Sequence, residues 1–193
     1  LYNTLSTIGS LANLGEADKV TQMVHGLSRF YRLTLNEGQV YISLDKEVEQ
    51  VKTYLDIQRV KYADAFRVYY DIDPDILHIP VIKLILQPFV ENIFKHAWFG
   101  ESIAIRLTGR RLGDRIELKV IDNGIGMRPD TLRAMRSGSP DPTGYGLRNV
   151  EERIKLRYGN DYGIRIGSHY GAGTTVQLIL PIDNSEIRED KGA

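Results

Sequence analysis

The stretch IELKVIDNGIGM (residues 116–127) decides the fold, because an alternating strand runs directly into a glycine-rich turn. Apolar and polar residues alternate along its first half, which is typical of a strand with one buried face. Asp122 ends the strand, and Gly124 and Gly126 follow at alternate positions. Glycine has no Cβ to keep a flat ligand off the backbone, and a carboxylate beside it can accept a hydrogen bond from an exocyclic amine such as that of adenine. An ordinary turn is the alternative, since Asp and Gly also serve turn geometry.

The flanking sequence predicts the rest of a sheet. SIAIRLTGRR (residues 102–111) alternates in the same way, and the turn Leu112-Gly113-Asp114 predicts that it forms a hairpin with the stretch above. Further strands are expected at residues 66–73, 162–170 and 174–181, and helices at residues 81–98, 129–135 and 147–158. We therefore expect an α+β domain over residues 65–182, whose late strands share one sheet, followed by a frayed charged tail at 183–193.

The sequence of the first 64 residues predicts helices and no strands. LYNTLSTIG (residues 1–9) has the apolar spacing of one helical face and no initiator Met, so we expect this helix to begin further upstream, in a longer protein. A second helix is expected over residues 16–36, and a third from Ser43 or Asp45 to about residue 64. Residues 1–64 are thus predicted to be a helical region truncated at its N-terminus.

Composition excludes several classes of function. Twenty-five basic and 25 acidic residues cancel, so no overall field favours nucleic acid or an anionic membrane. The chain has no cysteine, which excludes disulfides, thiol nucleophiles and Cys-ligated zinc. The longest apolar run, IPVIKLILQPFV (residues 79–90), is well short of the roughly 20 residues of a membrane span.

The predicted helix LQPFVENIFKHAW (residues 86–98) has one apolar and one polar face. Glu91, Asn92, Lys95 and His96 share the polar face. The carboxamide oxygen of Asn92 is a hard ligand that suits Mg²⁺, and Lys95 can meet a phosphate as a point charge. A solvated helix face is the alternative.

Two more glycine pairs follow along the chain. TGYGLRNVEERI (residues 143–154) runs from Gly144 and Gly146 into a helix, whose first amides form a ready anion site. YGAGTTVQLILP (residues 170–181) places Gly171 and Gly173 before a strand, as a tight hairpin turn also would. None of the pairs extends to GxGxxG, and no GxxxxGK[ST] motif is present.

The order of these motifs, a polar-faced helix with Asn92, then DxGxG, GxGL and GxGT, resembles the N, G1, G2 and G3 boxes of the GHKL superfamily of ATP-binding domains. Within it, LQPFVENIFKHA, DNGIGM, GYGLRNVEERI and LYNTL are similar to the LytS/YesM type of sensor histidine kinase over nearly the whole chain. The resemblance implies a two-layer α/β sandwich, the Bergerat fold, preceded by a helical dimerisation arm. It also implies ATP and Mg²⁺ as cofactors, and transfer of the γ-phosphate to a histidine and then to a response regulator.

The resemblance implies a nucleotide site made of these residues: Asn92, Lys95, His96, Asp122, Gly124, Gly126, Gly144, Gly146, Leu147, Gly171, Gly173 and Thr174. Asn92 would bind Mg²⁺, Asp122 would read adenine, and Gly124 and Gly126 would form the floor of the base pocket. Gly144, Gly146, Lys95 and the Leu147 amide would meet the phosphates. Gly171, Gly173 and Thr174 would close the adenine side, and residues 128–143 would form a lid over ATP.

The chain departs from the gyrase-like members at Pro88, which occupies the position of their catalytic Glu, so ATP hydrolysis is expected to be slow. Glu91 is a candidate for assisting proton removal from an acceptor imidazole. Matching the family's PHFLYN stretch places the phosphoacceptor histidine two residues before Leu1, so this chain is expected not to phosphorylate itself. Asn3, one turn further on, is a candidate for orienting water in dephosphorylation of the regulator.

The resemblance further implies a homodimer in the full-length protein, no nucleic-acid partner, and a place at the cytoplasmic face of the membrane through upstream sequence. Two other functions stay open. One is a GHKL ATPase that uses nucleotide to clamp or dimerise, and the other is a non-catalytic interaction module with the same fold.

Overall fold

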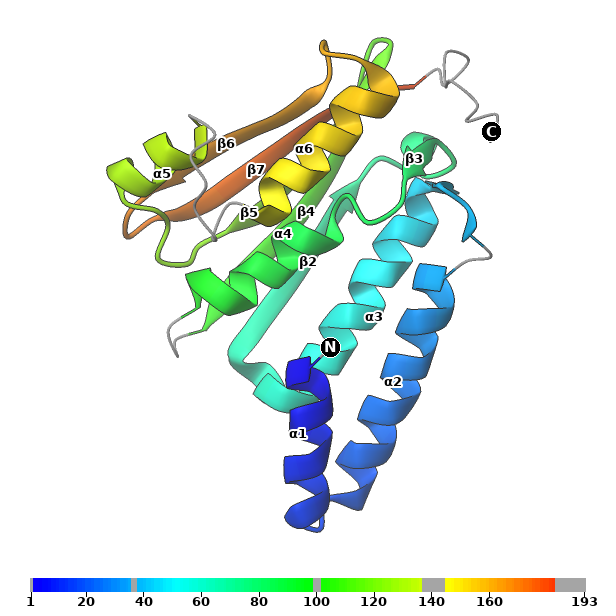
Figure 1. The fold of residues 1–193 in the computed structure, drawn as a ribbon, viewed down its shortest axis with the longest axis vertical. Helices are drawn as coiled ribbons and strands as arrows, with labels where there is room; N and C mark the ends of the chain where they lie inside the picture. The colour runs from blue at the N-terminus through cyan, green and yellow to red at the C-terminus, as the bar shows by residue number, and fades with distance from the viewer. Residues whose placement is uncertain (1, 36–37, 99–101, 137–144, 183–193) are drawn as a thin grey trace.

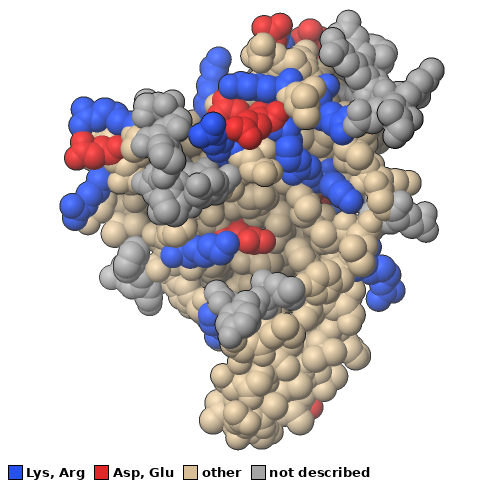
Figure 2. Space-filling view, viewed as in Figure 1, with Lys and Arg blue, Asp and Glu red and all other residues tan. Residues whose placement is uncertain are grey.

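The computed structural model describes residues 2–35, 38–98, 102–136 and 145–182, and has an α/β layer with a helical hairpin beside it. In Figure 1 the helices α4 and α6 lie over one face of a sheet, and α3 lies between them and the hairpin of α1 and α2. Figure 2 shows charged side chains gathered over the α/β layer, while the visible face of the hairpin carries few. The predicted α+β class is confirmed.

The main sheet has five strands in the order β2-β4-β5-β7-β6. The bounds are β2 Phe66–Ile72, β4 Ile103–Leu112, β5 Arg115–Asp122, β6 Gly163–His169 and β7 Gly173–Pro181. β2 runs parallel to β4, and the other neighbours are antiparallel. The predicted hairpin is confirmed: Leu112 pairs with Arg115 across a two-residue turn, in which Gly113 takes the positive φ that such turns need.

The helices are α1 Tyr2–Asn13, α2 Ala17–Leu35, α3 Leu44–Tyr62, α4 Gln87–Asn92, α5 Pro129–Arg136 and α6 Tyr145–Tyr158, with short 3₁₀ turns η2 Ala63–Ala65 and η3 Pro74–Ile76. The three helices that the sequence predicts for the first 64 residues are therefore present, but the prediction of helices alone is wrong, because Tyr41–Ser43 form the short strand β1. α2 packs closely on α3, because a Cβ on Gly26 would stand 2.9 Å from the Ile57 side chain. α3 buries polar as well as apolar side chains, since Glu47, Gln50 and Thr53 are buried beside Val48 and Val51.

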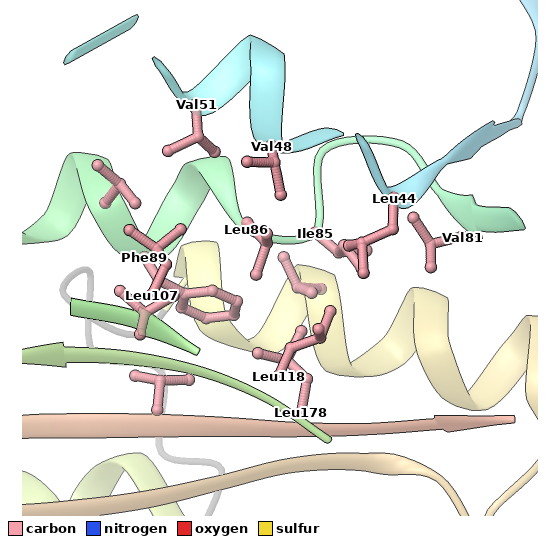
Figure 3. Packing of buried hydrophobic residues seen from close by; sticks show 14 of the residues in the cluster. Leu44, Val48, Val51, Val81, Ile85, Leu86, Phe89, Leu107, Leu118 and Leu178 are labelled. Atoms are coloured by element: carbon pink, nitrogen blue, oxygen red, sulfur yellow. The ribbon is translucent and has the colours of Figure 1, made fainter. Parts of the chain in front are cut away.

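The core lies between the sheet and the helices that cover it. Figure 3 shows Val48 and Val51 of α3 above Leu86 and Phe89, with Leu107, Leu118 and Leu178 of the sheet beneath. Strand positions alternate between buried and half-buried, as expected where only one face of a sheet is fully covered. The start of α4 is thus sandwiched between the helical region and the sheet.

The predicted helix over residues 81–98 is wrong at its start. Pro80–Ile82 form the strand β3, which pairs antiparallel with β1, Tyr41–Ser43. The helix α4 begins at Gln87, with a proline in its first turn, and widens into a π-helix, η4, over Ile93–Ala97. The run before Gln87 is mostly apolar and buried, and a short run of this kind cannot be assigned to helix or strand by its periodicity.

Candidate functional site

A pocket of about 240 Å³ opens between the helix α4–η4, the end of β5 and the start of β7. It is lined by Phe89, Asn92, Ile93, His96, Ala97, Val120, Asp122, Ile125, Gly126, Met127, Arg128, Thr131, Leu147, Tyr170, Thr174 and Val176. Most of these side chains are apolar, and the polar groups are few. Such a lining suits a flat, partly apolar ligand that is oriented by a small number of hydrogen bonds.

Asp122 is the buried charge of this pocket. It is 8% exposed, and its Oδ1 accepts the Gly124 backbone N–H at 2.9 Å. The carboxylate also accepts the backbone N–H of Thr174. Burial raises the pKa of Asp122 above its ordinary value, although both amide hydrogen bonds act in the opposite direction. Since a carboxylate has about four acceptor positions, Asp122 keeps acceptor capacity toward the pocket.

The glycines around Asp122 are required by close contacts between backbone segments. A Cβ on Gly124 would stand 2.4 Å from the Ala97 carbonyl oxygen, and one on Gly126 would stand 2.1 Å from that of His169. Gly126 and Gly173 also have positive φ. The sequence suggested that these glycines admit a ligand. The structure adds that they let η4, the turn after β5 and the β6–β7 turn pack on one another.

Asn92 and His96 line the pocket from the helix side, one turn apart. The π-helix begins directly after Asn92, and such widened turns are frequent at functional sites. The first turn of α6 lies beside Asn92: a Cβ on Gly146 would be 4.0 Å from the Asn92 Nδ2 atom and 3.9 Å from the Pro88 Cβ atom. The predicted metal-binding and phosphate-binding positions therefore lie next to each other.

Glu91 and Lys95 form an ion pair of 3.2 Å with each other. Glu91 also accepts a hydrogen bond of 3.1 Å from the buried Gln87. Among the described residues that line the pocket, neither Glu91 nor Lys95 is present. The four residues of the predicted polar helix face are thus divided. Asn92 and His96 line the pocket, whereas Glu91 and Lys95 pair with each other outside its lining.

Sequence reasoning missed Ser168, Met127 and Tyr170 at this site, and placed Arg128 only in the predicted lid. The Ser168 hydroxyl accepts the Met127 N–H at 2.8 Å and donates to the Gly173 carbonyl oxygen at 3.0 Å. Arg128 lies over the Tyr170 ring, 5.5 Å from its centroid, and both line the pocket. Adjacency could have found Met127 and Tyr170, because Met127 follows Gly126 and Tyr170 precedes Gly171, whereas Ser168 carries no such signal.

Some predicted positions lie outside the described residues. These are Gly144, residues 137–143 of the predicted lid, the predicted tail at 183–193 and the side chain of Asn3. Gly171 is described and has open space around it, since nothing lies within 4 Å of a Cβ built there. Its N–H donates to the Ile125 carbonyl oxygen at 2.6 Å, which ties the β6–β7 turn to the turn after β5.

Within the described residues, no group of three or more His, Cys, Asp or Glu side chains is placed to hold a metal ion. No helix there is both long and apolar enough to cross a membrane.

Two family models match the chain. The model described as "Histidine kinase" matches residues 1–66. The model described as "Histidine kinase-, DNA gyrase B-, and HSP90-like ATPase" matches residues 78–184, which is more than half of the chain.

Curated relatives match over nearly the whole chain. The sensor histidine kinase YesM of Bacillus subtilis is 32% identical over 189 residues, which cover 97% of this chain and 32% of the relative. The sensor histidine kinase BtsS of Escherichia coli is 28% identical over 183 residues, which cover 94% of this chain and 31% of the relative. The chain therefore spans about a third of the length of these relatives.

Solved structures share the fold. The histidine kinase domain of the blue-light activated kinase of Erythrobacter litoralis is similar with a TM-score of 0.57 and 16% identity, covering 92% of this chain and 83% of that one. The histidine kinase ThkA, solved in complex with the response regulator protein TrrA, gives 0.58 and 15%, covering 96% of this chain and 59% of that one.

Proposed function

Since the chain belongs to the family of histidine kinase-, DNA gyrase B- and HSP90-like ATPases, we propose that it is the ATP-binding part of a sensor histidine kinase. One observation carries the proposal. The buried carboxylate of Asp122 lies in an apolar pocket whose other wall carries Asn92, next to the start of α6. One end of the pocket thus suits a base, and the other suits phosphates.

Asp122 binds the adenine amine in this proposal. Its carboxylate is held by the N–H groups of Gly124 and Thr174, so it cannot rotate freely. The remaining lone pairs face a lining of apolar side chains that can stack on a flat ring. Tyr170 and Arg128 at the mouth of the pocket add one aromatic and one cationic group near the nucleotide.

Asn92 binds Mg²⁺, and the first turn of α6 binds the phosphates. Exposed backbone N–H groups and the helix dipole favour an anion at the start of α6, where Gly146 keeps side-chain atoms out of the way. The Asn92 carboxamide oxygen is one hard ligand, which suits an ion that takes its other ligands from phosphates and water. Bound Mg²⁺ supplies charge neutralisation on the phosphate oxygens. Lys95 and His96 are proposed to stand on the phosphate side, although Lys95 pairs with Glu91 in the free chain.

The chain delivers the γ-phosphate to a histidine, and the histidine passes it to a response regulator. Phosphoryl transfer requires positioning and charge stabilisation more than covalent chemistry by the protein, which fits a site with few titratable groups. Glu91 is the proposed group that assists proton removal from the acceptor, and Asn3 the proposed group that orients water for dephosphorylation. Pro88 leaves no carboxylate four residues before Asn92, so water attack on ATP is slow.

The helical region mediates dimerisation in this proposal. Exposed apolar side chains on α1, on α2 and in the turn between them suit a second copy: Leu5, Val24, Leu35 and, in the turn, Leu14. A response regulator is the expected protein partner, as it is for ThkA in its solved complex. Membrane attachment at the cytoplasmic face would come from sequence outside this chain.

Calorimetric titration with ADP, with ATP and with GTP, each with and without Mg²⁺, tests the proposal. We expect binding of both adenine nucleotides, at least about tenfold weaker GTP binding, and loss of at least about tenfold in affinity on Asp122→Ala. Equal affinity for ATP and GTP, or an Asp122→Ala protein that binds as tightly as the parent, would contradict the assignment of Asp122. A turnover of ATP in the range of a working ATPase would instead favour the clamp function.

A further inference from the structure

Leu84 has a backbone conformation that leucine rarely adopts. Its φ is +61°, in the left-handed region, and it stands three residues before the start of α4. A bulky residue is strained there and persists only where its surroundings enforce the conformation. The segment of Lys83, Leu84, Ile85 and Leu86, which we call the joint, therefore has to be held by other elements.

Glu47 of α3 holds the joint from one side. It is fully buried, and its two carboxylate oxygens accept the N–H groups of Leu84 at 2.8 Å and Leu86 at 2.9 Å. The N–H groups of Ile85 and Gln87 also interact with this carboxylate. One glutamate thus satisfies the backbone donors of the last three residues of the joint and of the first residue of α4, while the Lys83 N–H donates to the Val40 carbonyl oxygen at 3.0 Å. A buried carboxylate is costly unless it is hydrogen-bonded in this way.

Arg153 of α6 holds the joint from the other side. Its guanidinium donates to the carbonyl oxygen of Lys83 at 2.5 Å and to that of Leu84 at 3.4 Å. Tyr158, also in α6, accepts the Ile82 N–H at 2.9 Å. The N–H groups of Leu84 and Leu86 therefore face an anion of α3, while the carbonyl oxygens of Lys83 and Leu84 face a cation of α6, the helix that begins at the predicted phosphate site.

The joint leads directly into the residues of the nucleotide pocket. α4 begins at Gln87, and Asn92 is the last residue of this short helix. Figure 3 shows Leu86 between Val48 of α3 and Leu118 of the sheet, with Ile85 beside Leu44. Hydrogen bonds and packing therefore connect α3 to the segment that leads into α4 and Asn92.

We propose that Glu47 and Arg153 are positioning residues that hold the joint in its strained form, and that through it the helical region sets the place of Asn92 in the nucleotide site. The proposal rests on the proposed function, since the effect is read in nucleotide affinity. In this proposal, a movement of α3 changes the position of Asn92 through the hydrogen bonds that Glu47 makes to the joint. Neither residue touches the nucleotide pocket, so both act at a distance.

Glu47→Gln tests the proposal, because it keeps the shape of the side chain but turns an N–H₂ group toward backbone N–H groups. We expect at least about tenfold weaker Mg²⁺–ADP affinity by calorimetry. In the nucleotide-free protein, hydrogen exchange of amides 84–93 becomes faster, while exchange in β4 and β5 stays unchanged. The matched control is Glu49→Gln on the same helix, which removes only the surface ion pair with Arg29 and is expected to bind like the parent.

A rescue experiment separates positioning from packing. Glycine adopts a positive φ without strain, so Leu84→Gly added to Glu47→Gln should restore most of the lost affinity. If Glu47 acted only by filling the core, removing a second side chain would weaken the protein further. No recovery in the double variant overturns the claim that Glu47 maintains the strained form, and a Glu47→Gln protein that binds and exchanges like Glu49→Gln overturns the whole inference.

Arg153→Met is a second variant that probes the joint from α6 should Glu47→Gln fail to fold. It keeps the apolar stem and removes the two donors, and we expect the same loss of affinity and faster exchange at residues 84–93. Lys155→Met, on an exposed lysine of the same helix, is its control. Parent protein that binds no adenine nucleotide refutes the proposed function, whereas the exchange measurements still decide for or against the joint. Unchanged affinity and exchange in Arg153→Met overturn the inference.

Discussion

The Ser168 hydroxyl of β6 accepts the backbone N–H of Met127 at 2.8 Å, and so ties the segment after β5 to the far side of the pocket. The same hydroxyl donates to the Gly173 carbonyl oxygen and lies 2.9 Å from the Thr174 hydroxyl. Ser168→Ala would leave the Met127 N–H without its partner in a half-buried place. We expect a loss of about 1–2 kcal/mol in the free energy of unfolding, measured by urea denaturation, and several-fold weaker ADP binding.

Ser10→Ala is the control for this prediction. Its hydroxyl bonds to a carbonyl oxygen four residues earlier in the exposed helix α1, so its loss should leave both quantities unchanged. If Ser168→Ala binds ADP as tightly as Ser10→Ala does, Ser168 does not hold the pocket together.

Nucleotide affinity should depend on pH through Asp122. The pKa of its carboxyl group is raised by burial, and an adenine amine binds only the ionised form well. Nucleotide affinity is therefore full above this raised pKa and decreases as the pH falls through it. The decrease should occur at a higher pH than it would if the carboxyl group had the pKa of an exposed aspartate. Calorimetric titrations with ADP at a series of pH values should follow this curve.

The same shift makes a prediction for stability. Because the folded pKa lies above the unfolded one, folding favours the protonated form, so the contribution of Asp122 to the free energy of unfolding falls as pH rises between the two values. Asp122→Asn should remove this fall and weaken ADP binding at least about tenfold. Asp114→Asn, at a side chain that is 86% exposed, is the control and should leave both pH profiles intact.

Gly126 is, with Gly173, one of the two glycines whose replacement should cost most. An added Cβ would stand 2.1 Å from a backbone carbonyl oxygen of the β6–β7 turn, and the φ of +67° disfavours any side chain. We expect Gly126→Ala to lower the free energy of unfolding by about 2–4 kcal/mol, since the obstacle is backbone and cannot rotate away. Gly167→Ala in β6 has open space and should change stability by less than about 0.5 kcal/mol. Equal thermal midpoints for the two variants would refute the packing role of Gly126.

The strands and helices with clear periodicity could be predicted from the sequence. The hairpin of β4 and β5 follows from alternation and a glycine turn, and both lie where expected. The strands β1 and β3 could not be predicted, because each has three residues and their pairing joins positions about 40 residues apart. The burial of Glu47 could not be predicted either, because nothing in the local sequence indicates that its hydrogen-bond partners are the backbone N–H groups before α4.

For residues that occur in motifs, the sequence could predict that they lie close together, while their roles stay predictions. Asp122, Asn92 and Thr174 line one pocket, although they come from three separate segments. What the sequence could not provide was the side on which Lys95 stands, because rotation about the helix decides whether it faces the pocket or Glu91. Ser168 lies outside every motif, and its hydrogen bonds become visible only when β6 and the turn after β5 are placed together.

Asn92 should determine how strongly Mg²⁺ increases nucleotide affinity. If its carboxamide oxygen is the protein's ligand to the ion, Asn92→Ala removes the gain in ADP affinity that Mg²⁺ causes and leaves Mg²⁺-free binding nearly unchanged, since Asp122 still holds the base. His96→Ala, one turn further along the same pocket wall, is the control: it changes the lining without removing a hard ligand. The measurement is a pair of calorimetric titrations, with Mg²⁺ and with EDTA, for each protein. If Mg²⁺ still increases the ADP affinity of Asn92→Ala, other ligands bind the ion. If the increase is lost equally in Asn92→Ala and His96→Ala, the two substitutions have disturbed the helix side of the pocket rather than removed a ligand.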